Sequence, residues 1–242
     1  MNTKYGLQLY SVRDITGKDL GSAIRQVCAL GYKFVEFAGF FGNSAEQVKA
    51  MLNTCGITVS GTHSPLGDLR PTKIMETLRY HKTLGNPYYI IPGADLSTLE
   101  KIQDFANVVN FAAPIFAAEG IRIAYHNHDR EFKIMPWGST IHSELEKRTN
   151  IDFQIDTYWA WKAGVDPIAL LERLGSRVRC IHVKDGFEDG KGMALGEGNA
   201  PVAKVVEYAR KKGLTMVVES ETLTPTGLLE VERCINYLKT ID

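Results

Sequence analysis

Eight segments with the composition of β-strands recur along this chain, roughly every 30 residues, which is about the length of one strand–helix unit. They span residues 5–10, 33–37, 57–63, 88–93, 121–128, 151–156, 178–184 and 214–220. The stretches between them carry helical patterns instead. No other feature limits the fold as strongly, because strands that alternate with helices predict a parallel sheet covered by helices.

The stretches between the strands contain the start and stop signals of helices. Asp19 is a candidate N-cap for a helix that stops at Gly31. Ser44 and Gln47 form a capping-box pattern at the start of the next helix. Pro114 fits less well, because a proline should kink or split a helix that runs between residues 96 and 120.

Eight such units predict an α/β fold, the closed (β/α)₈ TIM barrel, formed as a single domain over residues 1–242. The main alternative is a doubly wound open sheet. Its dinucleotide fingerprint, GxGxxG, is missing after the first strand, which runs into the sequence SVRD. Because α/β barrels of this length form one domain and no linker interrupts the pattern, we expect the barrel.

Composition narrows the class of function. Lys and Arg number 28 and Asp and Glu number 28, so the formal net charge is zero, which argues against nucleic acid or an anionic membrane as a partner. The N-terminal stretch MNTKYGLQLY lacks the features of a leader, and no apolar run is long enough to span a bilayer. We expect a soluble, cytoplasmic protein. The four cysteines form no CxxC pair and are expected to be free thiols.

Polar and ionisable side chains stand where the predicted strands end. They are Gln8, Tyr10, Glu36, His63, His126, His128, Asp156, His182, Lys184, Glu219 and Glu221. In a parallel barrel the C-terminal ends of the strands form the active site. A lone charge after an apolar run is costly to bury, whereas carboxylates and imidazoles that converge can bind a divalent cation. Mixed oxygen and nitrogen donors suit Mn²⁺, Co²⁺, Fe²⁺ or Zn²⁺.

Side-chain alternation along the last four strands separates these residues into two layers. The layer closer to the barrel holds His126, Asp156, His182 and Glu219, and we expect these to be the ligands of one metal ion. The layer above, near the substrate, holds His128, Lys184 and Glu221. Taken singly, His182 suits a core histidine, Asp156 a turn cap and Glu219 a partner of Lys184. Because all four successive strands end in a residue that can bind a metal, we favour one metal site over four unrelated explanations.

Three further residues are candidate substrate contacts. Glu36 suits either a substrate contact or a salt bridge, and His63 is expected in the site. Trp159 lies after the sixth strand, where an aromatic ring stacks on a sugar or packs a loop.

The loop at 196–201, GEGNAP, follows the seventh strand, where barrels often hold phosphate on backbone N–H groups. Because no arginine or lysine accompanies it closely, we infer no phosphate site from this loop.

Seven motifs, taken in order, resemble the sugar phosphate isomerase/epimerase group, which has the xylose isomerase-like barrel. They are GLQLYSVRD, GYKFVEFAG, AYHNHDREF, IDTYWAWKAGVDP, IHVKD, GEG and VVESE, and together they cover essentially the whole chain. The resemblance implies one divalent metal, with Mn²⁺ as the first choice, bound by His126, Asp156, His182 and Glu219. His126 stands where the ketose epimerases carry glutamate, and Trp159 stands where several carry histidine. The YHxH strand resembles members that act on keto-inositols or oxidised sugars, including dehydratases.

The resemblance implies proton abstraction next to a carbonyl, with the metal stabilising the enediolate that forms. Glu219 is the candidate base, and His128 and Lys184 are candidates for the acid or for oxyanion support. A small-molecule sugar or keto-sugar is the expected substrate. Isomerisation, epimerisation and dehydration all remain open, as does assembly into a homo-oligomer. Two other classes are an abasic-site endonuclease, which net charge zero and a one-metal ligand count disfavour, and a non-catalytic sugar-binding barrel.

Overall fold

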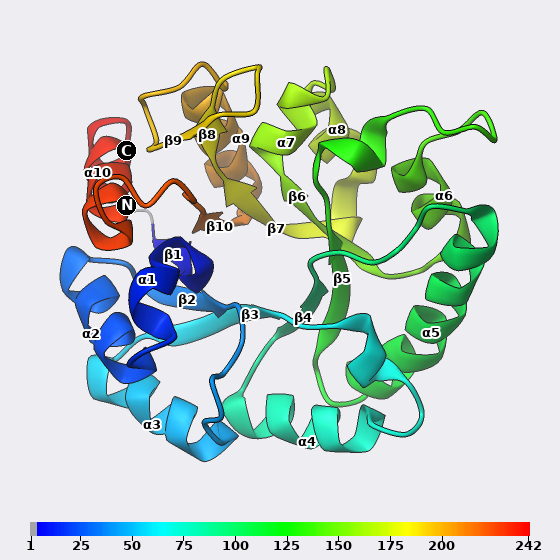
Figure 1. Cartoon of the computed structure of the whole chain (residues 1–242), viewed down its shortest axis with the longest axis horizontal. Coiled ribbons are helices and arrows are strands. Elements are labelled where there is room, and N and C mark those ends of the chain that lie inside the picture. Colours follow the sequence, from blue (N-terminus) through cyan, green and yellow to red (C-terminus); the bar gives the residue numbers. More distant parts are fainter. Residues whose placement is uncertain (1–3) are drawn as a thin grey trace.

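The computed structural model describes residues 4–242, so the first three residues of the stretch considered for a leader lie outside it. In this part of the chain eight parallel strands close into a barrel, which confirms the predicted fold class (Figure 1). The barrel strands are β1 (Tyr5–Gln8), β2 (Phe34–Phe37), β3 (Thr58–His63), β4 (Tyr88–Ile91), β5 (Arg122–His126), β6 (Asp152–Asp156), β7 (Val178–Val183) and β10 (Thr215–Val218). The ring closes because β1 pairs with both β2 and β10.

Helices surround the barrel and connect its strands (Figure 1). The α-helices are α1 (Arg13–Thr16), α2 (Leu20–Leu30), α3 (Ala45–Cys55), α4 (Ile74–Leu84), α5 (Leu99–Ala117), α6 (Ile141–Arg148), α7 (Thr157–Lys162), α8 (Pro167–Leu174), α9 (Val202–Lys212) and α10 (Gly227–Thr240). Short 3₁₀ turns are η1 (Leu9–Val12), η2 (Leu66–Leu69), η3 (Asp129–Phe132) and η4 (Gly175–Arg177). A small antiparallel ribbon, β8 (Asp185–Gly186) with β9 (Gly192–Met193), follows β7.

The predicted helix signals act as expected, with one exception. Asp19 accepts a hydrogen bond from the backbone of α2, and Gly31 ends that helix at φ 108°. The capping box of Ser44 and Gln47 starts α3. The predicted split at Pro114 is wrong, because α5 continues through it. Pro114 lies in the last turn of α5; it gives up only its own N–H bond, and its carbonyl still accepts a hydrogen bond from Ala118.

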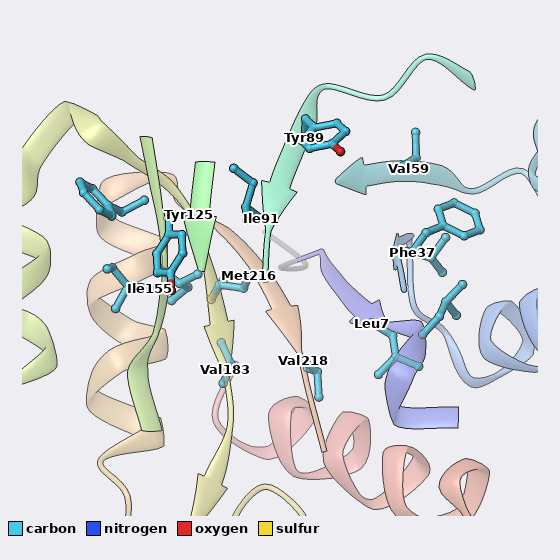
Figure 2. Close-up of a cluster of buried hydrophobic side chains, with 14 of the residues drawn as sticks. Leu7, Phe37, Val59, Tyr89, Ile91, Tyr125, Ile155, Val183, Met216 and Val218 are labelled. Atoms are coloured by element: carbon cyan, nitrogen blue, oxygen red, sulfur yellow. The ribbon is translucent and has the colours of Figure 1, made fainter. Parts of the chain in front are cut away.

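The apolar core lies between the barrel and its helices. Figure 2 shows its strand residues, among them Leu7, Phe37, Tyr125 and Val183, all of which are buried. Because side chains alternate along a strand, their neighbours point into the barrel instead. Those neighbours include polar residues, so the barrel interior beneath its C-terminal mouth is a buried polar region. Such residues are stable there only when they are hydrogen-bonded or bind an ion.

None of the helices in residues 4–242 combines the length and the hydropathy that crossing a membrane requires.

Candidate functional site

The C-terminal ends of four consecutive barrel strands bring His126, Asp156, His182 and Glu219 together. One potential ligand atom from each lies within 4.8 Å of the others, and all four residues are buried. Strand register explains the convergence, because Asp156 pairs with His182 across β6 and β7. Glu219 follows β10 directly, and its backbone N–H donates to Val183 at the end of β7. The structure thus assembles the layer that alternation predicts.

Asp156 shows that this cluster fits a metal ion. Its Oδ1 accepts a hydrogen bond from the backbone of Trp159 at 2.9 Å, which also caps α7. Its Oδ2 is buried and has no hydrogen-bond partner within residues 4–242. Burial raises the pKa of Asp156 to about 7, with the Glu219 carboxylate adding to the rise and Lys184 opposing it. A buried carboxylate oxygen without a partner is costly, and a cation bound there would remove that cost.

His182 and Glu219 form the centre of the cluster. His182 Nδ1 lies 3.2 Å from Glu219 Oε2. Although burial lowers the pKa of His182, the Glu36 and Glu219 carboxylates raise it to about 10. Burial also favours the neutral acid of Glu219, but Lys184 and His182 hold the pKa of Glu219 well below its usual value. In the metal-free protein, a proton on His182 therefore supplies positive charge between the two carboxylates.

His126 is held as a neutral imidazole. Burial, together with the nearby rings of His182 and His63, lowers the pKa of His126 well below its usual value. Its Nδ1 lies 3.1 Å from Gln154 Oε1. A neutral imidazole is the form that binds a metal ion. Gln154 is not among the predicted site residues, although its position two residues before Asp156 places it on the same face of β6.

The second predicted layer centres on Lys184. This lysine is buried, it forms a short ion pair with Glu221, and its Nζ lies 3.5 Å from Glu219 Oε2. The same Nζ lies 4.9 Å from the centroid of the Trp159 ring, and the His128 ring lies 5.9 Å from that ring between centroids. The three members of this layer therefore lie together, with Trp159 against two of them.

A cavity of about 590 Å³ opens at the mouth beside this cluster. Its walls are Tyr10, Ala38, Gly39, His63, Ser64, Pro65, Pro92, Gly93, His126, His128, Glu219 and Glu221. Of the predicted substrate contacts, His63 and Glu221 line it, whereas Trp159 and Glu36 do not. Glu36 lies inside the barrel, fully buried, 3.1 Å from His63 and 2.6 Å from His182. This position fits the salt bridge, the second of the two alternatives for Glu36.

The loop after β7 is organised around an unpredicted residue, Asp185. Its buried carboxylate accepts hydrogen bonds from the backbone N–H groups of Gly186, Gly196, Gly198 and Ala200, at 2.8 to 3.1 Å. A Cβ at Gly198 would collide with this carboxylate, which explains the small residue there. The N–H groups that barrels often direct at phosphate therefore have an acceptor in the chain itself.

Comparison with known proteins agrees with the fold. The family model of the xylose isomerase-like TIM barrel matches residues 24–240. The chain belongs to this family. None of the curated proteins compared with it matches significantly. A solved sugar phosphate isomerase/epimerase from Parabacteroides distasonis ATCC 8503 has a TM-score of 0.85 at 22% identity, and the match covers 99% of this chain and 96% of that one.

Two more solved structures share the barrel at lower identity. One is a D-psicose 3-epimerase with D-tagatose from Clostridium cellulolyticum H10, with a TM-score of 0.73, 15% identity and 99% of each chain covered. The other is a probable 3-DHS dehydratase from Bacillus anthracis, with a TM-score of 0.75, 12% identity, and 97% of this chain and 99% of that one covered. At such identities the likeness shows the fold alone.

Proposed function

We propose that this protein is a divalent-metal-dependent isomerase or epimerase of a sugar or keto-sugar. The observation that carries the proposal is the set of four ligand atoms within 4.8 Å of one another, beside a cavity of about 590 Å³. His126, Asp156, His182 and Glu219 would hold the ion, and Mn²⁺ is our first choice for this donor set. The family membership supports the same class of chemistry.

The bound ion would polarise a substrate carbonyl and stabilise negative charge on its oxygen. The chain supplies the proton transfers. Glu219 lines the cavity and is ionised, because Lys184 and His182 lower its pKa, so it can accept the proton next to the carbonyl. Lys184 is buried beside Glu219, where its ammonium group can support the developing oxyanion.

His128 is the residue we assign to returning a proton. It lines the cavity, and burial lowers its pKa, so a proton that the ring takes up is given up more readily than the proton of a free imidazolium. His63 and Glu221 also line the cavity and would contact sugar hydroxyls. Trp159 would act by holding His128 and Lys184 in place, since its ring contacts both.

Dehydration of a keto-inositol or an oxidised sugar is the second candidate. The observation that favours it is a pair of histidines at the C-terminal end of β5. His126, the last residue of the strand, belongs to the proposed ligand set, whereas His128, two residues further on, does not and is left to act on the substrate. An imidazole facing the substrate suits protonation of a departing hydroxyl group. Both candidates begin with the same proton abstraction by Glu219, and they differ in whether a hydroxyl leaves afterwards.

The first test is metal stoichiometry, followed by solvent exchange. The dialysed protein, loaded in turn with each candidate ion, should retain about one equivalent of metal by plasma mass spectrometry. In ²H₂O it should then exchange the proton next to the carbonyl of a ketose or keto-inositol, which proton NMR detects, and the product spectrum separates dehydration from isomerisation. Metal retention without exchange would indicate a sugar-binding barrel, and two or three equivalents would favour the nuclease class.

A further inference from the structure

A network of buried side chains lies inside the barrel, directly beneath the four proposed ligands. Its centre is the carboxylate of Glu36 on β2, which accepts hydrogen bonds from His182 Nε2 and Gln154 Nε2, both at 2.6 Å. Gln8 Nε2 donates to the same carboxylate at 2.8 Å. Gln154 Oε1 in turn lies 3.1 Å from His126 Nδ1. Because β2 is not a neighbour of β6 or β7 in the barrel, these bonds cross its interior.

Donor and acceptor chemistry fixes the direction of each hydrogen bond. An ionised carboxylate can only accept, so His182 Nε2 and Gln154 Nε2 must both carry the protons that they share with Glu36. The amide of Gln154 is thereby turned with its oxygen toward His126, and His126 Nδ1 must then be a donor. The nitrogen available to a metal is Nε2 in His126 and, once the proton that it shares with Glu219 leaves, Nδ1 in His182.

We propose that Glu36 is a positioning residue that fixes, directly and through Gln154, which nitrogen of each histidine ligand faces the metal. This inference rests on the metal site of the proposed function and assigns the buried network a role in it. In the opposite tautomer, either histidine would turn an N–H toward the ion and would not bind it. Outer partners of this kind raise the basicity of a histidine ligand and fix its ring orientation.

The geometry of the cluster agrees with this assignment. His182 Nδ1 lies 3.2 Å from the proposed ligand Glu219, so it faces the cluster, while Nε2 faces Glu36 on the opposite side of the ring. Gln154 also lies 2.9 Å from His63 Nε2, which joins a third imidazole to the network. One buried carboxylate therefore orders three rings that come from β3, β5 and β7.

Nitrogen-15 NMR of the wild-type protein loaded with Zn²⁺ tests the assignment without a variant. We expect His182 to show a metal-bound Nδ1 and a protonated Nε2, and His126 to show a metal-bound Nε2 and a protonated Nδ1. Spectra in which either ring binds through its other nitrogen would overturn the proposal. A wild-type protein that binds none of the four candidate ions would overturn the proposed function, which is a different result.

Two variants then separate the direct route from the route through Gln154. Glu36→Gln should perturb the tautomers of both His126 and His182 and weaken Co²⁺ binding about 10- to 100-fold by calorimetry. Gln154→Met should perturb His126 alone. The control is Asp152→Asn, which neutralises another buried carboxylate, paired with Arg122 at the far end of β6. The control should lower stability without changing Co²⁺ affinity or the tautomers.

The inference fails if Glu36→Gln binds Co²⁺ as tightly as the wild type does, with the same imidazole spectra. It also fails if Asp152→Asn weakens binding to the same extent, since loss of affinity would then follow from general destabilisation. Should Glu36→Gln not fold, the wild-type spectra still decide the question, because they report the tautomer of each ring directly.

Discussion

Replacing His81 by phenylalanine should make the fold less sensitive to acid. His81 lies in α4, is buried, and packs its ring edge-on against Tyr89, with 5.0 Å between centroids. Its Nδ1 lies 3.0 Å from Asn86 Nδ2. Burial lowers the pKa of His81 to about 4, although Asp68 opposes the shift.

The direction of the effect follows from proton binding. In the unfolded chain His81 has the ordinary histidine pKa of 6.5, and in the folded chain its pKa is about 4. Between these pH values His81 therefore binds a proton in the unfolded chain but not in the folded chain. Stability contributed by neutral His81 is therefore complete above about pH 6.5 and is lost as the pH falls toward 4. At about pH 4.5 the loss amounts to about 2.5 kcal/mol, since each pKa unit corresponds to about 1.4 kcal/mol.

Urea unfolding of the wild type and of His81→Phe, at about pH 8 and about pH 4.5 and with chelator present, measures this difference. The free energy of unfolding of the wild type should fall by about 2.5 kcal/mol more than that of the variant between the two pH values. Other titrating groups change the free energy of unfolding of both proteins by the same amount, so their contributions cancel in the difference. An equal fall in both proteins would refute the reasoning, because it would mean that His81 takes up a proton without cost in the folded state.

Three further predictions concern the mouth of the barrel. Asp185→Ala should lower the free energy of unfolding by about 1–3 kcal/mol, and hydrogen exchange should quicken over residues 196–200, since their N–H groups lose an acceptor; unchanged exchange would contradict the described loop. Glu219→Gln should slow solvent exchange into the substrate by about 100-fold or more, and Glu221→Gln, the matched control in the second layer, should have a smaller effect. Removing the metal with chelator should lower the melting temperature of the wild type at neutral pH, because the buried Asp156 oxygen loses its partner; Asp156→Asn should not respond to chelator.

The four residues of the proposed ligand set could be placed together from the sequence. Strand periodicity gives the face on which His126 and Glu219 lie, and a parallel barrel brings the C-terminal ends of its strands to one rim. Neither step needs the details of packing. The helix caps at Asp19 and Ser44 were predictable for a similar reason, because their signals lie within four residues of chain.

The contacts that cross the barrel were not predictable. Glu36 and Gln154 are 118 positions apart, and their meeting depends on the tilt and stagger of strands that are not neighbours. The role of Asp185 depends on the backbone path of a loop that folds back on itself, which periodicity does not describe. The continuation of α5 through Pro114 was not predictable, because the burial of Ala112 and Phe116 on either side of it is a tertiary feature.

The carboxylate of Asp185 also bears on which sugars the mouth can admit. A phosphoryl group could bind the N–H groups of this loop only by displacing the Asp185 carboxylate. That carboxylate is part of the chain and is therefore always present at high effective concentration. Displacing it would leave Asp185 charged, buried and next to a second anion. The N–H groups of this loop therefore already have an anionic acceptor, and under the proposed function we expect turnover of a free ketose in preference to the corresponding ketose phosphate.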